Sequence, residues 1–303
     1  MPAVSVIDMS PETAYYVGTC SHVNESDEMD ACAERRLAWL QRMHAPGVRV
    51  KVAIADGDPV GFAHVMPISV SPWGPLGHDL AVVPCLFVEQ KARGLGAGRA
   101  LVAASEGEAR RQGMRGIATI AYFWDFWFMP ASFFERLGYE VADRRDDEAV
   151  LWKAFGKVFA EDEPAGQPAR AGQVAPRRIP WGVTGSEPGT GFLPSGSPTA
   201  GFARPRLLRP RYIFEPVPGK AAVDLFWNTF CQTSNIEAQR VREVAAQFGD
   251  KVVLREFCAD DRDVLLRYQI PRAIFVQGQE IGWGYEAPRE GIREAIAKAI
   301  AAG

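Results

Sequence analysis

The spacing of hydrophobic positions in the first half of the chain predicts alternating strands and helices. The pattern predicts helices over 34–43 and 100–113 and strands over 48–54, 59–68, 80–88, 116–121 and 149–153. The two strands before residue 70 flank the turn Asp56-Gly57-Asp58, which is typical of a hairpin. Residues 1–157 are therefore predicted to form an α/β domain, a mixed twisted sheet with flanking helices.

A second pattern begins near residue 213. It predicts, in order, a strand over 223–227, a helix over 234–249, a strand over 251–257, a short helix over 263–268, a hairpin of 270–276 with 280–283, and a helix over 289–301. The hairpin would turn at Gln277-Gly278-Gln279. Residues 213–303 are thus predicted to form a βαβαββα domain.

A segment rich in proline and glycine, 158–212, separates the two patterns. Eight prolines and eight glycines lie between Pro164 and Pro205, without helical or strand periodicity, which is typical of a linker. The segment is also basic. It is either a solvated linker or a segment whose arginines bind phosphates and whose aromatic side chains cover the acceptor site. The arginines and aromatics in question are Arg170, Arg177, Arg178, Arg204, Arg206, Arg209, Arg211, Trp181, Phe192 and Phe202.

Composition excludes several classes of protein. The chain has 303 residues, 47% of them hydrophobic, and a net charge of −3, which permits two cores and argues against a general nucleic-acid binder. No apolar run is long enough to span a membrane, and no basic-then-apolar leader is present at the start. Five irregularly spaced cysteines do not form a disulfide or metal pattern, so we expect a reduced, cytoplasmic protein without a metal. The oligomeric state is left open.

A glycine-rich stretch after the predicted strand 80–88 carries the clearest chemical signal. Gly94, Gly96 and Gly98 lack the Cβ atoms that would keep a pyrophosphate away from the backbone N–H groups at a helix N-terminus, and Arg93 and Arg99 add positive charge. An ordinary strand-to-helix turn would also use glycines. The spacing Arg93-x-x-Gly96-x-Gly98 resembles the coenzyme A pyrophosphate loop of the GNAT superfamily of N-acetyltransferases. The resemblance implies a coenzyme A contact formed by Phe87, Val88, Arg93, Gly94, Leu95, Gly96, Ala97, Gly98 and Arg99.

A second motif supports this resemblance. Residues 131–140 resemble the late helix and strand start of the same superfamily, where Gly138 would provide a left-handed C-cap. The superfamily usually has its catalytic tyrosine where this chain has Phe134. The usual proton donor is therefore missing.

The C-terminal pattern resembles the thioredoxin fold. Cys231 lies between the first strand and its helix, and Ile270-Pro271 precedes the third strand, where that fold has a cis proline facing the active thiol. Ser234 stands where a second cysteine is expected, and Ser234 with Glu237 also fits a capping box. A helix N-terminus favours thiolate, so Cys231 is expected to have a lowered pKa and to be the most reactive thiol. Cys258 is expected to be a core residue.

Together the two halves resemble the YoaP-like branch of the acetyltransferases. Trp73-Gly74 and Val83-Pro84-Cys85-Leu86 resemble elements of that branch, and the resemblance covers nearly the whole chain apart from the linker. It implies that acetyl-CoA is the donor and that backbone groups near Phe87 and Val88 hold the thioester carbonyl. His78 and Asp79 are candidate bases, although they also fit an ordinary loop, and Tyr122 and Cys85 are candidate acids.

An aromatic run over 122–130 predicts where the acceptor binds. Trp124, Asp125 and Trp127 lie in the loop after a strand, where acceptors enter this fold, and a carboxylate among aromatic rings would attract a cationic amine. The same rings would also suit a core. The sequence therefore predicts N-acetylation of a small amine or amino-acid-like acceptor. Two alternatives stay open, an acyltransferase that uses aminoacyl-tRNA and a thiol sensor or partner-binding protein that uses Cys231.

Overall fold

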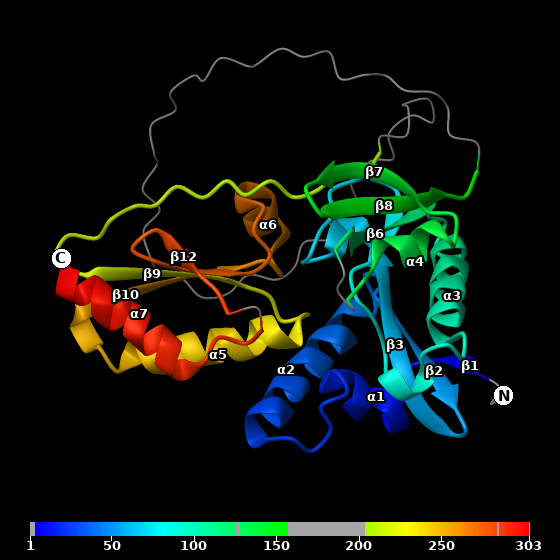
Figure 1. Ribbon diagram of the computed structural model, residues 1–303, viewed down its shortest axis with the longest axis horizontal. Helices are drawn as coiled ribbons and strands as arrows, with labels where there is room; N and C mark the ends of the chain where they lie inside the picture. Colours follow the sequence, from blue (N-terminus) through cyan, green and yellow to red (C-terminus); the bar gives the residue numbers. More distant parts are fainter. Residues whose placement is uncertain (1–3, 125–127, 157–203, 284, 303) are drawn as a thin grey trace, which may run out of the picture. The chain divides into compact units, whose positions relative to one another are not determined.

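The computed structural model describes residues 4–124, 128–156, 204–283 and 285–302, and it contains two separate sheets (Figure 1). The first sheet has eight strands in the order β1-β2-β3-β4-β6-β8-β7, with β5 paired to β3. The predicted mixed sheet is confirmed, because β4 and β6 run parallel whereas β2 and β3 are antiparallel. Its strands are β1 (Ser5–Asp8), β2 (Arg49–Ala55), β3 (Asp58–Pro67), β4 (Leu80–Val83), β5 (Leu86–Val88), β6 (Gly116–Tyr122), β7 (Glu140–Arg145) and β8 (Glu148–Ala154).

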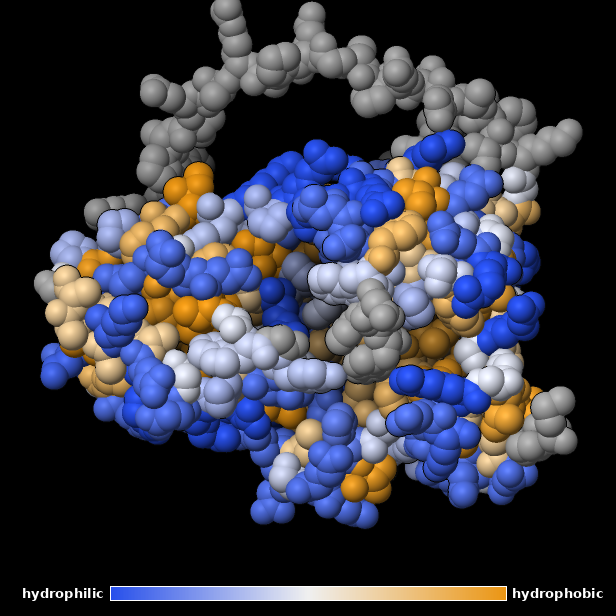
Figure 2. Space-filling view, viewed as in Figure 1, coloured by the Kyte–Doolittle hydropathy of each residue, from blue (hydrophilic) through white to orange (hydrophobic). Residues whose placement is uncertain are grey.

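Helices flank this sheet. They are α1 (Pro11–Gly18), α2 (Asp27–Met43), α3 (Ala97–Arg111) and α4 (Ala131–Glu135). Helix α2 starts seven residues before the predicted position, because Ser26 caps it by accepting a hydrogen bond from the Met29 N–H at 3.2 Å and three acidic residues follow in the first turn. Hydrophilic side chains dominate the outer surface of α2 in Figure 2, whereas Trp39 and Leu40 on the same helix are buried.

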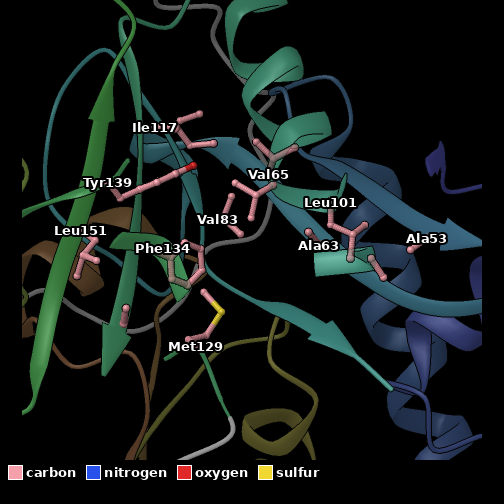
Figure 3. Close-up of a cluster of buried hydrophobic side chains, with 14 of the residues drawn as sticks. Ala53, Ala63, Val65, Val83, Leu101, Ile117, Met129, Phe134, Tyr139 and Leu151 are labelled. Atoms are coloured by element: carbon pink, nitrogen blue, oxygen red, sulfur yellow. The ribbon is translucent and has the colours of Figure 1, made fainter. Parts of the chain in front are cut away.

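The core of the first sheet lies beneath α3 and α4. Figure 3 shows Phe134 from α4 beside Met129 and near Tyr139, and the rings of Phe134 and Tyr139 are 5.6 Å apart. Gly138 has a φ of +81° after α4, so the predicted left-handed cap is confirmed. Phe134 is a core residue with no polar group, and its position therefore offers no proton donor.

The second sheet has four strands in the order β10-β9-β11-β12. Its elements are β9 (Ala221–Trp227), α5 (Gln232–Ala246), β10 (Val252–Cys258), α6 (Arg262–Tyr268), β11 (Ala273–Val276), β12 (Gln279–Ile281) and α7 (Arg289–Ala302). This is the predicted βαβαββα order. Strand β10 is parallel to β9, whereas β11 is antiparallel to β9 and to β12.

Part of the segment 204–212, which the sequence assigns to the linker, packs against the rest of the described chain. Leu207 and Leu208 are buried, and Arg206 and Leu76 exchange two backbone hydrogen bonds of 2.9 Å. Tyr212 stacks on Phe275 with ring centroids 4.0 Å apart. The earlier part of the predicted linker, including Arg170, Arg177, Arg178, Trp181, Phe192 and Phe202, lies outside the described residues.

Within the described parts of the chain, no helix combines the length and apolar character needed to cross a membrane. In the same ranges, no group of three or more His, Cys, Asp or Glu side chains is placed to hold a metal ion.

Candidate active site

The predicted buried strand 80–88 is broken in the middle. Strand β4 ends at Val83 and β5 begins at Leu86, with Pro84 and Cys85 between them. Proline cannot donate a backbone hydrogen bond, so it interrupts the ladder at this point. Strand β4 pairs with β6 as far as Val83 and Thr119, and the Thr119 hydroxyl donates to the Val83 carbonyl at 2.8 Å.

Beyond this break the sheet opens between β5 and β6. Strand β5 pairs only with β3 among the described strands, while β6 continues to Tyr122 paired with β8 on its other edge. At its end, the Tyr122 N–H donates to the Met129 carbonyl at 3.0 Å. The His64 N–H donates to the Cys85 carbonyl and the Glu89 N–H to the Val60 carbonyl. Since backbone groups alternate in direction along a strand, Leu86 and Val88 present their N–H and C=O groups to the opening and Phe87 presents its own to β3.

The contact between β3 and β5 explains one glycine. A Cβ at Gly61 would lie 2.5 Å from the Phe87 carbonyl oxygen, so only glycine permits this approach. The position of β5 against β3, with its other edge turned toward β6, therefore depends on Gly61.

The glycine-rich loop follows β5 and leads into α3. Gly94 and Gly96 have φ values of +83° and +86°, a conformation that L side chains rarely adopt. A Cβ built on either glycine meets no atom within 4 Å, so the space in front of the loop is open. Gly96 is the N-cap of α3, whose first N–H groups have no partner within the helix. Arg93 and Arg99 are exposed, and Leu95 packs against the core.

This geometry fits the pyrophosphate of coenzyme A. The loop offers unpaired N–H groups, the positive end of a 15-residue helix and two exposed cations around one open space. Gly98 and Ala97 lie in the first turn of α3, and a Cβ on Gly98 would come 3.2 Å from the Phe133 ring. Gly98 therefore permits close packing of Phe133, in addition to its predicted contact with coenzyme A.

The two candidate bases are not brought to the opening. His78 and Asp79 are exposed and precede β4, at the end of that strand opposite to Cys85. Six residues of extended chain between Asp79 and Cys85 span about 20 Å. Asp79 has a φ of +55°, and its carbonyl accepts from the Arg115 N–H at 2.8 Å. Asp79 is therefore a loop residue.

Aromatic residues border the opening at the end of β6. Tyr122 and Trp124 stack with their ring centroids 5.1 Å apart, and Trp124 is half exposed. Burial, reinforced by the negative charge of Glu148, raises the pKa of Tyr122 to about 12, so its hydroxyl stays protonated at neutral pH. Asp125 and Trp127, which were predicted to bind the acceptor with Trp124, lie outside the described residues.

Four of the five cysteines influence one another in the structure, which their spacing did not predict. Burial raises the pKa of Cys85, and the nearby thiols of Cys20 and Cys231 raise it further. Burial also raises the pKa of Cys32 to about 12, with Cys231 and Cys20 again among its neighbours. As whole residues, Cys20, Cys85 and Cys231 are partly exposed.

Cys231 is the N-cap of α5, as expected, but its predicted pKa shift is wrong in direction. Burial raises the pKa of Cys231, and the opposing effect of the Arg272 charge does not compensate. A helix terminus contributes about 1 kcal/mol at most at ordinary sites, less than one pKa unit, whereas burial shifts a pKa by up to about 3–5 units. Desolvation therefore dominates.

Two other expectations for this region are corrected. Ser234 does not cap α5, which begins at Gln232, and its hydroxyl instead accepts from the Asn228 N–H at 3.0 Å. The bond between Ile270 and Pro271 is trans, since the cis peptide among the described residues is Gly74–Pro75. The Asn228 side chain donates to the Pro271 carbonyl at 2.9 Å.

Helix α2 contacts the start of α5. Arg35 donates to the Asn235 side chain at 2.8 Å, and the Cys32 thiol donates to the Gln232 carbonyl with a separation of 3.6 Å. The Phe230 ring lies 4.8 Å from the His64 ring on β3. The loop that carries Cys231 therefore packs against α2 and β3, close to the broken strand. Arg36 and His64, which belong to this cluster, carry no local sequence signal that predicts a site.

Comparison with known proteins finds a family match within the first domain. Residues 46–141 match the family model described as the acetyltransferase (GNAT) domain, and the match includes the broken strand, the glycine loop and α4. A search of curated proteins finds no match. The match is confined to this stretch, which is about a third of the chain.

Solved structures similar to the chain cover about half of it. A GNAT-family acetyltransferase from Staphylococcus aureus Mu50 is 14% identical with a TM-score of 0.38, and 51% of this chain and 100% of that chain are covered. The ribosomal-protein-alanine N-acetyltransferase of Brucella melitensis is 18% identical with a TM-score of 0.37, covering 50% of this chain and 99% of that chain. The PaiA N-acetyltransferase of Thermoplasma acidophilum in complex with coenzyme A is 13% identical with a TM-score of 0.36, covering 50% and 99%.

Proposed function

We propose that this protein transfers the acetyl group of acetyl-CoA to the amino group of a small molecule. The observation that carries the proposal is the position of the glycine loop directly after β5, whose outer edge faces an opening in the sheet. One binding track therefore runs from the N-terminus of α3 to the broken strand. The length of this track suits an elongated ligand with an anionic end.

Residues along the track have separate roles in the proposal. The N–H groups at Gly96, Ala97, Gly98 and Arg99 hold the pyrophosphate, and Arg93 and Arg99 contribute charge. The outward N–H and C=O groups of Leu86 and Val88 pair with amide groups of the coenzyme. A backbone N–H at this edge also stabilises negative charge that develops on the thioester oxygen, because it is fixed before the reaction starts.

In the reaction, the amine nitrogen bonds to the thioester carbonyl carbon, the C–S bond breaks, the amine loses a proton and the sulfur leaves as the coenzyme A thiol. Tyr122 and Cys85 border the opening from β6 and from the break in the central strand. Both are protonated at neutral pH because burial raises their pKa values. Each can therefore donate a hydrogen bond to the departing sulfur. Tyr122 is the better candidate, because the pKa of the Cys85 thiol also depends on the charges of Arg36 and Cys231.

The acceptor in this proposal enters past the aromatic residues at the end of β6. Trp124 offers an exposed ring stacked on Tyr122, and Asp125 and Trp127 follow it directly in the chain. A carboxylate next to such rings favours a cationic amine. His78 and Asp79 remain weaker candidates for the base, because they precede β4 at its far end.

The C-terminal domain is proposed to be thioredoxin-like. A parallel β10-β9 pair continued by two antiparallel strands, with a cysteine at the N-cap of the helix after β9, supports this assignment. Ser234 and the trans Ile270–Pro271 bond depart from a dithiol oxidoreductase. The raised pKa of Cys231 removes the support for a sensor that depends on a reactive thiolate, and a docking domain of the YoaP-like type suits the observations better.

The proposed function is tested by incubating the purified full chain with acetyl-CoA and an amine library, followed by mass spectrometry for a mass gain of one acetyl group. A turnover that depends on acetyl-CoA and is unaffected by ribonuclease supports the proposal. A requirement for RNA would favour the aminoacyl-tRNA alternative. Tight coenzyme binding without acetylation of any amine would reject the enzymatic proposal.

A further inference from the structure

Arg36 is a fully buried arginine without a carboxylate partner. It is 1% exposed, and none of the ion pairs in the described part of the chain includes it. Its Nη1 donates to the carbonyls of Val17 and Gly18 at 2.8 and 3.4 Å, and its Nη2 lies 3.4 Å from His64 Nε2. A buried charge without a counter-charge is costly, and proteins usually pair it.

The surroundings of Arg36 do not neutralise it. The Phe62 and Phe230 rings lie 5.9 and 5.7 Å from the guanidinium carbon, which gives a cation–π interaction but no negative charge. Its Nε atom is buried and has no hydrogen-bond acceptor. The two backbone carbonyls explain how Nη1 is held at the end of α1, but they explain neither the charge nor the free Nε donor.

Other buried donors in this region also lack an acceptor. His64 is 0% exposed, and because Arg36 donates to its Nε2, its proton lies on Nδ1, which has no partner. The Nδ2 group of Asn235 is buried without a partner as well. Arg36 contacts His64 directly, and its neighbour Arg35 contacts Asn235. Unmatched donors around an unpaired cation are the pattern expected of an anion site.

This cluster adjoins the broken strand of the candidate active site. The His64 N–H donates to the Cys85 carbonyl at 3.1 Å, and the charge of Arg36 acts on the thiols of both Cys85 and Cys231. Cys20, Cys85 and Cys231, on which the cluster borders, are partly exposed as whole residues. An anion at Arg36 would therefore lie next to the point where β5 leaves β6.

We propose that Arg36 binds the carboxylate of the acceptor, and that the acceptor class is a small amino acid or amino-carboxylate. The inference rests on the proposed acetyltransferase function. A carboxylate supplies the missing counter-charge and accepts from the free Nε donor. The amino group of the same molecule is then held near Cys85, beside the opening.

The test compares matched acceptors that differ only in the carboxylate. The full chain is assayed with alanine, alanine amide and ethylamine, and with the same three forms of leucine and phenylalanine, under saturating acetyl-CoA. We expect kcat/KM for the best amino acid to exceed that of its amide by at least about tenfold, the size of one charge-assisted hydrogen bond. Equal or better use of the amide by the unaltered protein would overturn the inference but leave the proposed function intact.

Variants of Arg36 sharpen the test. Arg36→Gln should reduce the preference for the carboxylate over the amide to less than about threefold, and Arg36→Lys should retain an intermediate preference because it keeps the charge. Arg42→Gln, an exposed position on the same helix, is the matched control and should behave as the unaltered protein. A uniform fall for all three acceptor forms in both Arg36 variants would assign Arg36 a purely structural role.

A binding measurement covers the case in which the variants fold poorly. With coenzyme A present, the N-acetyl form of the preferred amino acid should raise the Tm of the unaltered protein, and the N-acetyl amide at the same concentration should not. Equal stabilisation by both compounds would overturn the carboxylate site. Absence of acetylation with any acceptor, despite coenzyme binding, would instead reject the proposed function.

Discussion

Arg36 Nη2 lies 3.4 Å from His64 Nε2 in the interior of the first domain, and this contact fixes the protonation state of the imidazole. Burial lowers the pKa of His64 well below its ordinary value, and the positive charge of Arg36 lowers it further. The folded protein therefore holds a neutral histidine whose lone pair faces a cation. The neutral imidazole accepts from Arg36 on one side and donates from Nδ1 on the other.

The neutral His64 predicts a loss of stability at mildly acidic pH. Below about pH 6.5 the unfolded chain binds a proton at this histidine and the folded chain does not, so the free energy of unfolding falls as the pH falls. The loss from His64 alone is about 1 kcal/mol between pH 6.5 and 5.5. Urea unfolding at pH 7.5, 6.5 and 5.5 measures it.

The matched variant for this prediction is His64→Gln, in which a polar amide replaces the imidazole and cannot titrate. Its stability should fall by about 1 kcal/mol less over the same interval than that of the unaltered protein. His44→Gln, at an exposed position, is the control and should retain the original pH dependence. Identical pH dependence in the His64 variant and the unaltered protein would show that His64 is protonated equally in both states.

Gly96→Ala is predicted to impair acetyl-CoA binding. The φ of +86° strains any side chain there, and the added Cβ would enter the open space in front of the loop. We expect at least about a tenfold increase in Kd, equivalent to about 1.4 kcal/mol. Isothermal titration calorimetry with acetyl-CoA measures the change.

Gly113 offers a matched control at the other end of α3. It has a φ of +72°, and a Cβ there also meets no atom within 4 Å, so Gly113→Ala introduces similar strain away from the loop. Both variants should lose similar stability, but only Gly96→Ala should bind the coenzyme more weakly. Equal Kd values for the two variants would mean that the loop does not contact the pyrophosphate.

The sequence predicted regular, strongly patterned elements of the fold well. The hairpin turn at Asp56-Gly57 was predictable, because tight hairpin turns need positive φ values and Asp-Gly adopts them readily. The observed φ values are +52° and +91°. Strand β1 and helix α1 were not predicted, because four and eight residues give too few repeats of either period. The run 80–88 was predicted as one strand, although Pro84 already marked a position where the ladder must break.

The candidate site was less predictable, because its decisive contacts join distant positions. The glycine loop is contiguous in sequence and could be found from its spacing. By contrast, Arg36, His64 and Phe230 come from three different elements, and an arginine within an amphipathic helix normally lies on the solvated face. The pKa of Cys231 was misjudged for the same reason, since the helix terminus is visible in sequence and the burial is not.

Tyr122→Phe is predicted to lower kcat by about 100-fold, the lower end for loss of a general acid, with little change in the KM for acetyl-CoA. Cys85→Ala should change kcat by less than about threefold if Tyr122 is the donor. Because burial raises the pKa of Tyr122 to about 12, kcat of the unaltered protein should not fall between pH 7 and 9 through deprotonation of this group. A large loss of kcat in Cys85→Ala with a small loss in Tyr122→Phe would instead identify Cys85 as the proton donor.

Cys231 is predicted to react slowly with alkylating reagents, in contrast to a thiol activated by a helix terminus. Its pKa is raised by burial, so at pH 7 the thiolate fraction is below that of a free cysteine with a pKa of about 8.5. The rate should rise steadily with pH through the alkaline range. Iodoacetamide labelling of the folded and the urea-unfolded chain at pH 7, 8 and 9, with peptide mapping, compares the two rates at this residue.

Arg272 provides the second half of this test. Its charge lowers the pKa of Cys231 against the effect of burial, and its side chain pairs with Glu237 at 2.7 Å. Arg272→Gln should therefore slow the labelling of Cys231 further in the folded protein and leave the rate in the unfolded chain unchanged. If Cys231 were instead the fastest thiol of the folded protein at pH 7, solvation at the helix terminus would outweigh burial, and the thiol-sensing alternative would regain its physical basis.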